Sequence, residues 1–233
     1  MSYIPKHQLR ADAAGDDPSV RLSAVTKSYQ TGDVAVLALR GVNLTVPQGQ
    51  FVVILGPSGS GKTTLMNVIG GIETPSAGEV VVSGSDLTGS DESSLTDYRR
   101  REVGFVFQFF NLIPTLTAFE NVALVAELVG LGEAEARAAL TEVGLAERAD
   151  HFPSALSGGE QQRQQQRVAL ARALANEPPL LLCDEPTGNL DTANTAVVYD
   201  LFRTINKELG TTFLIVTHDR KVAQQTDRIL EVL

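Results

Sequence analysis

The sequence FVVILGPSGSGKTT, residues 51–64, decides the fold of this chain. Its first five residues are all apolar and are bounded by glycines, which is typical of a central strand buried on both faces. The next segment, GPSGSGKT at residues 56–63, matches the pattern G-x-x-x-x-G-K-[ST], and a helix is predicted over residues 61–69. A strand before the pattern and a helix after it are the context that a phosphate-binding loop requires. We therefore predict an α/β core built around such a loop.

Each residue type in this loop has a physical reason to bind phosphate. Glycines let the backbone wrap closely, so that its N–H groups point inward at phosphate oxygens. The helix N-terminus adds a partial positive charge. Lys62 is predicted to reach the β- and γ-phosphates, and Thr63 to offer its hydroxyl to Mg²⁺. The predicted nucleotide contacts in the loop are Gly56, Pro57, Ser58, Gly59, Ser60, Gly61, Lys62, Thr63 and Thr64. A plain glycine-rich turn is the alternative, and the strand and helix on either side disfavour it.

Strand and helix patterns alternate over the rest of the chain. Strands are predicted over 20–29, 34–46, 79–83, 103–107, 180–183 and 212–216, and a helix over 191–209. The stretch 117–174 is rich in Ala, Leu and Glu and predicts a helical insert. Buried strands that alternate with helices predict a mainly parallel sheet covered on both faces. We expect a polar tail over residues 1–19 and a single domain over 20–233, with a helical subdomain at about 109–175.

Composition narrows the functional classes. The chain has 233 residues, 43% of them hydrophobic, with a formal net charge of -9. A free-standing nucleic-acid-binding protein usually has a basic face, so we expect no nucleic-acid partner. The single cysteine cannot form a disulfide within the chain, which suits a reducing compartment. No apolar stretch approaches the roughly 18–20 residues that span a bilayer, so another chain would have to supply any membrane span.

Two carboxylates follow the predicted strand at 180–183. Ligands of α/β sheets gather at the carboxyl ends of strands, so Asp184 is predicted to hold Mg²⁺, mostly through water. Glu185 is expected to point elsewhere, because adjacent strand residues face opposite sides. That placement suits a residue that orients or deprotonates an attacking water. An exposed acidic turn is the alternative for the pair taken alone.

The pentapeptide LSGGE at residues 156–160 makes the prediction specific. Ser157 can cap a helix N-terminus and Glu160 can complete a capping box. Gly158 and Gly159 leave backbone N–H groups accessible to an anion. A phosphate loop, this pentapeptide and the acidic strand, in this order, resemble an ABC ATPase over about residues 20–233. The fold implied is a P-loop NTPase core with a mainly parallel sheet, an N-terminal antiparallel β portion and an inserted α-helical subdomain.

The resemblance implies roles for four further residues. Tyr29 resembles the aromatic residue that stacks on adenine, and Gln108 resembles the glutamine that senses Mg²⁺ and couples to a membrane partner. Asp191 resembles part of the loop that contacts the other subunit, and His218 resembles the histidine that contacts the γ-phosphate. Taken without the motifs, Tyr29 and His218 would be interpreted as surface residues at strand ends.

The resemblance also implies the assembly and the location. Ser157, Gly158, Gly159 and Glu160 of one subunit would contact ATP held by the other, in a head-to-tail homodimer with two ATP molecules at the interface. The segments 108–117 and 186–191 are similar to ATPases of the lipoprotein-releasing and macrolide- or peptide-export group. We therefore expect a Mg²⁺-dependent ATPase at the cytoplasmic face of the membrane, bound to an integral membrane permease.

Three other functions stay open at this point. The same residues would serve an ATPase that switches a non-transporting membrane complex, such as a cell-division or cell-wall system. A soluble nucleic-acid machine would be expected to carry long coiled coils or two such domains. A general phosphate-loop kinase or GTPase is disfavoured by the pentapeptide and by the absence of an Asn-Lys-x-Asp run.

One segment departs from the family pattern. The run QQRQQQR at residues 161–167 is about four residues longer than the step that usually follows the pentapeptide. Four helical residues add about 6 Å and about 400° of rotation, so the helix must lengthen or bulge. We expect a tolerated polar insertion. The alternative is a displaced docking of Ser157 and Gly159 on the opposite ATP.

Overall fold

The structure is a computed structural model that describes residues 17–32, 34–153, 158–219 and 226–232. The central layer is a five-stranded parallel sheet in the order β6-β7-β8-β3-β9. Its strands are β3 (Phe51–Leu55), β6 (Val103–Phe107), β7 (Leu180–Asp184), β8 (Thr212–Val216) and β9 (Arg228–Glu231). Every residue of β3 and of β8 is buried, which is why the sequence shows continuous apolar runs there.

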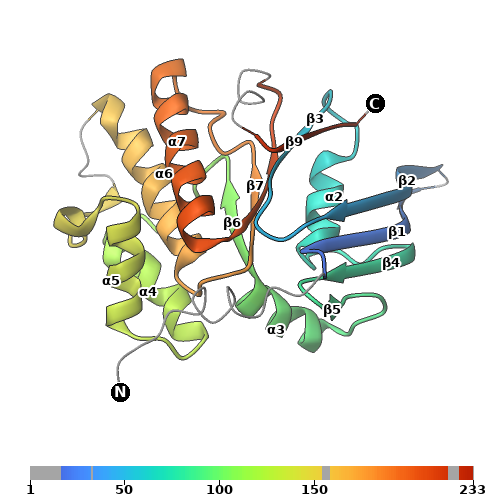
Figure 1. Ribbon diagram of the computed structural model, residues 1–233, viewed down its shortest axis with the longest axis horizontal. Coiled ribbons are helices and arrows are strands. Elements are labelled where there is room, and N and C mark those ends of the chain that lie inside the picture. Colours follow the sequence, from blue (N-terminus) through green and yellow to red (C-terminus); the bar gives the residue numbers. More distant parts are fainter. Residues whose placement is uncertain (1–16, 33, 154–157, 220–225, 233) are drawn as a thin grey trace.

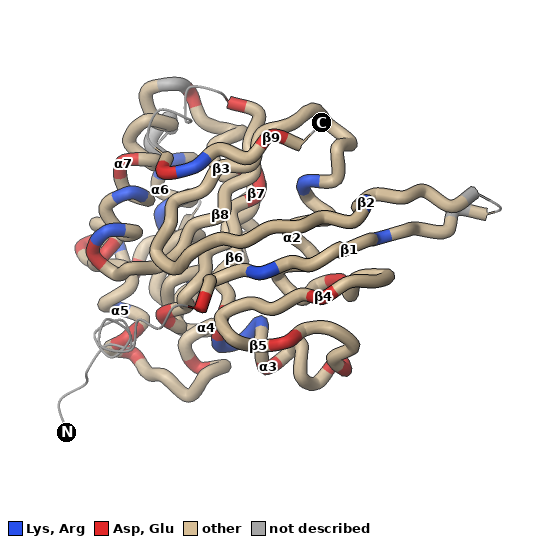
Figure 2. Tube along the Cα trace, turned by 45° about the vertical axis from the view of Figure 1, so that its right-hand side comes forward, with Lys and Arg blue, Asp and Glu red and all other residues tan. Residues whose placement is uncertain are grey.

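A second sheet is antiparallel and lies beside the first. It has the order β2-β1-β4-β5, with β1 (Val20–Thr31), β2 (Val34–Val46), β4 (Ala77–Val82) and β5 (Ser85–Asp86). Figure 1 places this sheet on one side of the molecule, with helix α2 (Lys62–Ile69) near it. In Figure 2 the strands β1 and β2 form a long ribbon, and Lys, Arg, Asp and Glu are scattered over the elements in that view.

The remaining helices lie mostly on the opposite side (Figure 1). They are α4 (Ala118–Leu128), α5 (Glu133–Glu142), α6 (Gly158–Leu174) and α7 (Thr192–Leu209), with the short 3₁₀ turn η1 (Ala146–Arg148); α3 (Glu92–Glu102) precedes β6. The fold is therefore the mixed α/β architecture that the sequence predicts. Within the described ranges, none of the helices combines the length and apolarity needed to span a bilayer.

The alternation of side chains along β3 divides the core into two halves. Val52 and Ile54 pack with helix α2 and with residues of the antiparallel sheet. Phe51, Val53 and Leu55 pack with helices α4 to α7. Because successive strand residues point to opposite faces, one short strand holds both layers together. The phosphate loop leaves the C-terminal end of this strand, so the loop begins at a strand that is buried along its whole length.

Helix α6 is continuous through the lengthened segment 161–167. The extra residues therefore add a helical turn and do not loop out. Residues 154–157 lie outside the described part of the chain, and so does most of the predicted tail, residues 1–16.

Candidate nucleotide site

The loop between β3 and α2 has the conformation that its glycines allow. Gly61 has φ 93°, and a Cβ atom there would lie 2.6 Å from the carbonyl oxygen of Ala38. A Cβ atom on Gly56 would lie 2.6 Å from the carbonyl oxygen of Val232. Larger residues would collide with backbone at both places, so the tight turn depends on glycine.

Helix α2 begins without a side-chain cap. Gly61 is its N-cap residue and makes no side-chain hydrogen bond to the first turn. The first N–H groups of a helix have no partner within the helix, and they carry partial positive charge. The Lys62 ammonium lies beside them and donates to the carbonyl oxygens of Gly56 (2.8 Å) and Pro57 (2.6 Å). This end of α2 is thus equipped to bind an anion.

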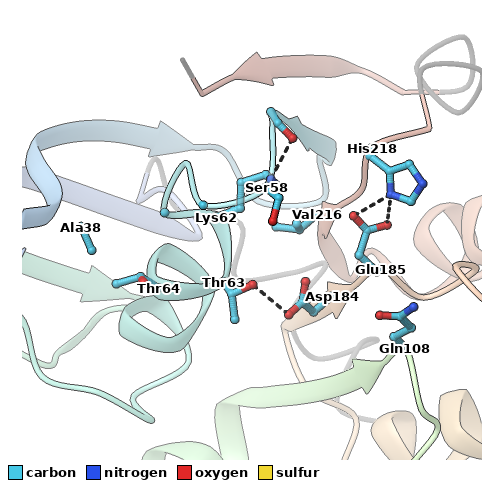
Figure 3. Close-up of a pocket in the computed structure, with 13 residues that line it drawn as sticks. Ala38, Ser58, Lys62, Thr63, Thr64, Gln108, Asp184, Glu185, Val216 and His218 are labelled. Carbon is cyan, nitrogen blue, oxygen red and sulfur yellow. Dashed lines mark hydrogen bonds and ion pairs between the residues drawn. The ribbon is translucent and has the colours of Figure 1, made fainter. Parts of the chain in front are cut away.

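The loop opens into a cavity of about 480 Å³. Residues from separate parts of the chain line it, and most of them were predicted as site residues: Gly56, Ser58, Gly59, Gly61, Lys62, Thr63, Thr64, Gln108, Asp184, Glu185 and His218. Figure 3 shows Thr63, Gln108, Asp184, Glu185 and His218 lying near one another, from α2 and from the ends of β6, β7 and β8. Ala38 and Val216 also line the cavity. Their apolar side chains carry no chemical signal in the sequence.

The C-terminal end of β7 and the first turn of α2 bring two oxygen-bearing side chains together. The Thr63 hydroxyl donates to Oδ2 of Asp184 at 3.2 Å (Figure 3). Burial raises the pKa of the Asp184 carboxyl; the hydrogen bond from Thr63 opposes that shift, and the charge of Glu185 adds to it. A partly buried carboxylate beside a hydroxyl suits a hard divalent cation, which takes oxygen ligands and would offset the desolvation. These residues therefore fit Mg²⁺.

Glu185 points away from Asp184 and toward His218. Both carboxylate oxygens lie 3.0 Å from Nδ1 of His218 (Figure 3). Glu185 lies one residue beyond β7 and has φ 46°, in the left-handed region. Its N–H donates to the carbonyl oxygen of Val216 at 2.9 Å. The separation of the two carboxylates thus follows from a left-handed residue at the strand end, in addition to the alternation expected from the sequence.

Gln108 is held at the cavity by the loop that follows β7. The backbone carbonyl oxygen of Gln108 accepts a hydrogen bond from Nδ2 of Asn189 at 2.9 Å. Gly188 lies so close that a Cβ atom there would be 2.9 Å from Nε2 of Gln108. The segment after β6 and the segment after β7 are therefore packed against each other at the edge of the site.

Tyr29 lies next to the loop but does not line the cavity. Its hydroxyl donates to Glu73 (2.6 Å) and lies 3.4 Å from the Thr64 hydroxyl. Glu73 also accepts from Asn67 (2.9 Å) and forms an ion pair with Lys27 (3.2 Å). Although burial pushes the pKa of Glu73 upward, these hydrogen bonds and the Lys27 charge lower it overall. No local pattern in the sequence indicates Glu73, because its partners lie up to 46 positions away.

Three other predicted residues that the structure describes, Asp191, Pro57 and Ser60, do not line the cavity. Asp191 caps α7 by accepting from the N–H of Asn194 at 2.8 Å. Gly158, Gly159 and Glu160 are the first residues of α6, and Ser157 lies outside the described residues. Pro57 and Ser60 belong to the loop, although their side chains do not line the cavity.

Comparison with known proteins agrees with this arrangement. The sequence model described as ABC transporter matches residues 39–188. The chain is 45% identical to the lipoprotein-releasing system ATP-binding protein LolD of Shewanella oneidensis, over 92% of this chain and 93% of the relative. It is also 45% identical to the macrolide export ATP-binding/permease protein MacB of Syntrophobacter fumaroxidans, over 91% of this chain and 30% of that larger protein.

A solved structure supports the same assignment. The dimeric post-hydrolysis state of the ATP-binding cassette MJ0796, bound to ADP and Pi, superposes with a TM-score of 0.81 at 44% identity. That match covers 91% of this chain and 94% of the solved chain. The family match, the near full-length relatives and the shared fold agree with the phosphate loop and the carboxylates around one cavity. The chain therefore belongs to the ABC transporter family, as an ATP-binding and ATP-hydrolysing subunit.

Proposed function

We propose that the cavity between α2 and the ends of β6, β7 and β8 is the site where this chain hydrolyses ATP. The observation that carries the proposal is the meeting of Lys62, Thr63, Asp184, Glu185 and His218 around one cavity. The backbone N–H groups of residues 58–64 would bind the phosphates, whereas Pro57 has no N–H to donate. Lys62, now bonded to carbonyl oxygens of its own loop, would turn to the β- and γ-phosphates.

Mg²⁺ would be held by Thr63 and Asp184, with Gln108 at the edge of the same cavity. When bound, the ion would neutralise charge on the phosphate oxygens. The chain's own contribution is to keep these oxygen ligands at the ends of two rigid elements, β7 and α2. Rigid placement favours catalysis because little reorganisation is left for the reaction itself.

Glu185 would orient the attacking water and accept a proton from it as the water attacks the γ-phosphate in line. His218 contacts both carboxylate oxygens, so it can fix the direction of Glu185, and it would steady the γ-phosphate. Tyr29 would stack on the adenine with its ring held through Glu73.

A complete site would need two subunits. Ser157, Gly158, Gly159 and Glu160 would contact the ATP of the partner, and Asp191 would lie near the interface. The dimeric structure of the relative MJ0796 supports this homodimer. Asp191 does not line the cavity of a single subunit, in agreement with a place at the interface.

The cellular role follows from the relatives. LolD is named as part of a lipoprotein-releasing system, and MacB as a macrolide export protein with ATP-binding and permease functions in one chain. We propose that residues 20–233 form one ATPase domain, with a helical subdomain at about 109–175. This domain would drive a separate integral membrane permease from the cytoplasmic face, in lipoprotein release or macrolide or peptide export.

Replacing Glu185 by Gln tests the assignment. The variant should retain ATP binding and lose turnover by about 10²–10⁴-fold, the usual contribution of a general base. It should also form a dimer in the presence of ATP, measured by light scattering. Wild-type turnover per subunit should increase with protein concentration. Rapid turnover by Glu185→Gln, or a rate per subunit independent of concentration together with no ATP-dependent dimer, would contradict the proposal.

A further inference from the structure

Arg172, in the last turn of α6, reaches across to the segment that follows Gln108. Its Nη2 donates to the carbonyl oxygen of Phe110 at 2.8 Å, and its Nη1 donates to that of Asn111 at 2.5 Å. These partners are 62 and 61 positions away in the sequence. One guanidinium group therefore joins the helix that starts with the pentapeptide to the loop that begins at the cavity.

The two carbonyl groups belong to a strained part of the backbone. Phe110 has φ 37° and Asn111 has φ 51°. A residue other than glycine in this region costs free energy and persists only where surrounding contacts hold it. The loop is also fixed at its far end, because buried Asn121 of α4 accepts from the N–H of Ile113 and donates to its carbonyl oxygen. The segment after Gln108 is therefore held by Arg172 at Phe110 and Asn111, and by Asn121 at Ile113.

The guanidinium group of Arg172 is a partly buried cation. Burial lowers the pKa of its guanidinium group. In the described ranges of the chain no carboxylate forms an ion pair with it. Among the described residues, the partners of its side chain are the carbonyl groups of Phe110 and Asn111. A partly buried cation without a counter-charge is costly unless its hydrogen bonds are well formed, so the position of the loop and the position of α6 depend on each other.

We propose that Arg172 is a positioning residue for ATP hydrolysis, which transmits movements of α6 to Gln108 through the carbonyl groups of Phe110 and Asn111. Gly158 and Arg172 are 14 positions apart on one continuous helix, about 21 Å along its axis. When the first turn of α6 engages the partner subunit, the helix moves as one rod, and Arg172 moves the loop with it. This inference rests on the proposed role of Gln108 at the nucleotide site.

The test compares Arg172→Gln, Arg172→Lys and Gln108→Ala, alone and as the double variant Arg172→Gln/Gln108→Ala. Arg100→Gln is the control, because Arg100 lines the same 470 Å³ groove as Arg172 and its side chain pairs with Asp97 in the part of the chain that the structure describes. Turnover at saturating ATP, KM for ATP and the melting temperature are measured for each.

We expect Arg172→Gln to lower kcat about 10-fold or more and to change KM less than about 2-fold, since Arg172 does not line the nucleotide cavity. Arg172→Lys should recover part of kcat, and Arg100→Gln should match the wild type. The double variant should be no slower than the slower single variant, because both changes interrupt one path.

Two results would overturn the inference while leaving the role of Gln108 intact. One is a reduced kcat for Gln108→Ala with a normal kcat for Arg172→Gln. The other is a double variant whose loss is the product of the two single losses. A normal kcat for Gln108→Ala would overturn the proposed role of Gln108 and this inference with it.

Discussion

Gln166 provides the sharpest test of how the structure accommodates the lengthened helix. Its side chain is 0% exposed, and neither its Oε1 nor its Nε2 has a hydrogen-bond partner among the described residues. It lies on α6, which packs against α4 and α5. A buried polar group without a partner costs about 1–3 kcal/mol of unfolding free energy. The position is therefore expected to be a net cost to stability.

Replacing Gln166 by Met removes both polar atoms and keeps an unbranched side chain of similar length. Gln and Met have similar helix propensities, so the helix itself should be unaffected. We expect the free energy of unfolding to increase by about 1–3 kcal/mol, and the melting temperature by about 2–12 °C for a chain of this size.

Urea denaturation followed by circular dichroism measures this difference. The matched control is Gln162→Met, one turn earlier on the same helix, where the side chain is exposed; it should change stability by less than about 0.5 kcal/mol. A loss of stability in Gln166→Met with an unchanged denaturant slope would refute the reasoning, because the amide would then have a partner such as a bound water.

Three further predictions concern the helix, the adenine side of the site and the C-terminal strand. Deletion of residues 164–167 restores the shorter pattern and brings the start of α6 about 6 Å closer to its end. We expect the variant to have an ATPase rate within about 2-fold of wild type. A loss of rate greater than about 10-fold would exclude a tolerated insertion. Glu73→Gln should loosen Tyr29, and so raise KM for ATP about 2- to 10-fold with kcat nearly unchanged; an equal fall in kcat would place Glu73 elsewhere in the mechanism. Asp227→Asn should destabilise the protein by about 0.5–1.5 kcal/mol near pH 7, measured by urea denaturation.

The pH dependence of the Asp227 effect has a defined sign. The hydrogen bond from Arg203 lowers the pKa of Asp227; burial opposes it, and the N–H of Phe51 adds to the lowering. Because the folded pKa lies below the unfolded value, the stabilisation is present above that unfolded value and is lost as the pH falls through the folded pKa. The stability difference between wild type and Asp227→Asn should therefore shrink in acid. A difference that grows below pH 4 would contradict this assignment.

The sequence predicts β3, β6, β7 and β8 of the parallel sheet well because most of their residues are buried, whereas β9 is largely exposed. Phe51–Leu55, Val103–Phe107 and Thr212–Val216 have the same bounds in the structure as in the sequence prediction. Helix Glu92–Glu102 was not predicted, because it is mostly polar and buries only Leu95 and Tyr98. The usable signal was Asp91, whose side chain accepts from the N–H of Ser94 at the start of that helix.

The residues of the site fall into two groups: those that a local sequence pattern indicates, and those whose contacts depend on distant segments. The loop at residues 56–63 and the carboxylates after β7 are visible in sequence, because each is defined by its immediate neighbours. The contacts of Arg172, Asn189 and Glu73 join segments 44 to 81 positions apart. Nothing in a single sequence indicates which distant carbonyl or hydroxyl such a side chain will reach.

Cys183 gives the protein a practical advantage for measuring movement. It is the single cysteine of the chain, it is 0% exposed in the middle of the parallel sheet, and burial strongly raises the pKa of its thiol. Thiol reagents react with the thiolate, so this residue should stay unlabelled in the folded protein. A fluorophore or spin label could then be attached at one introduced cysteine without first removing the native one, and subunit closure could be followed as a change in distance between labels during turnover.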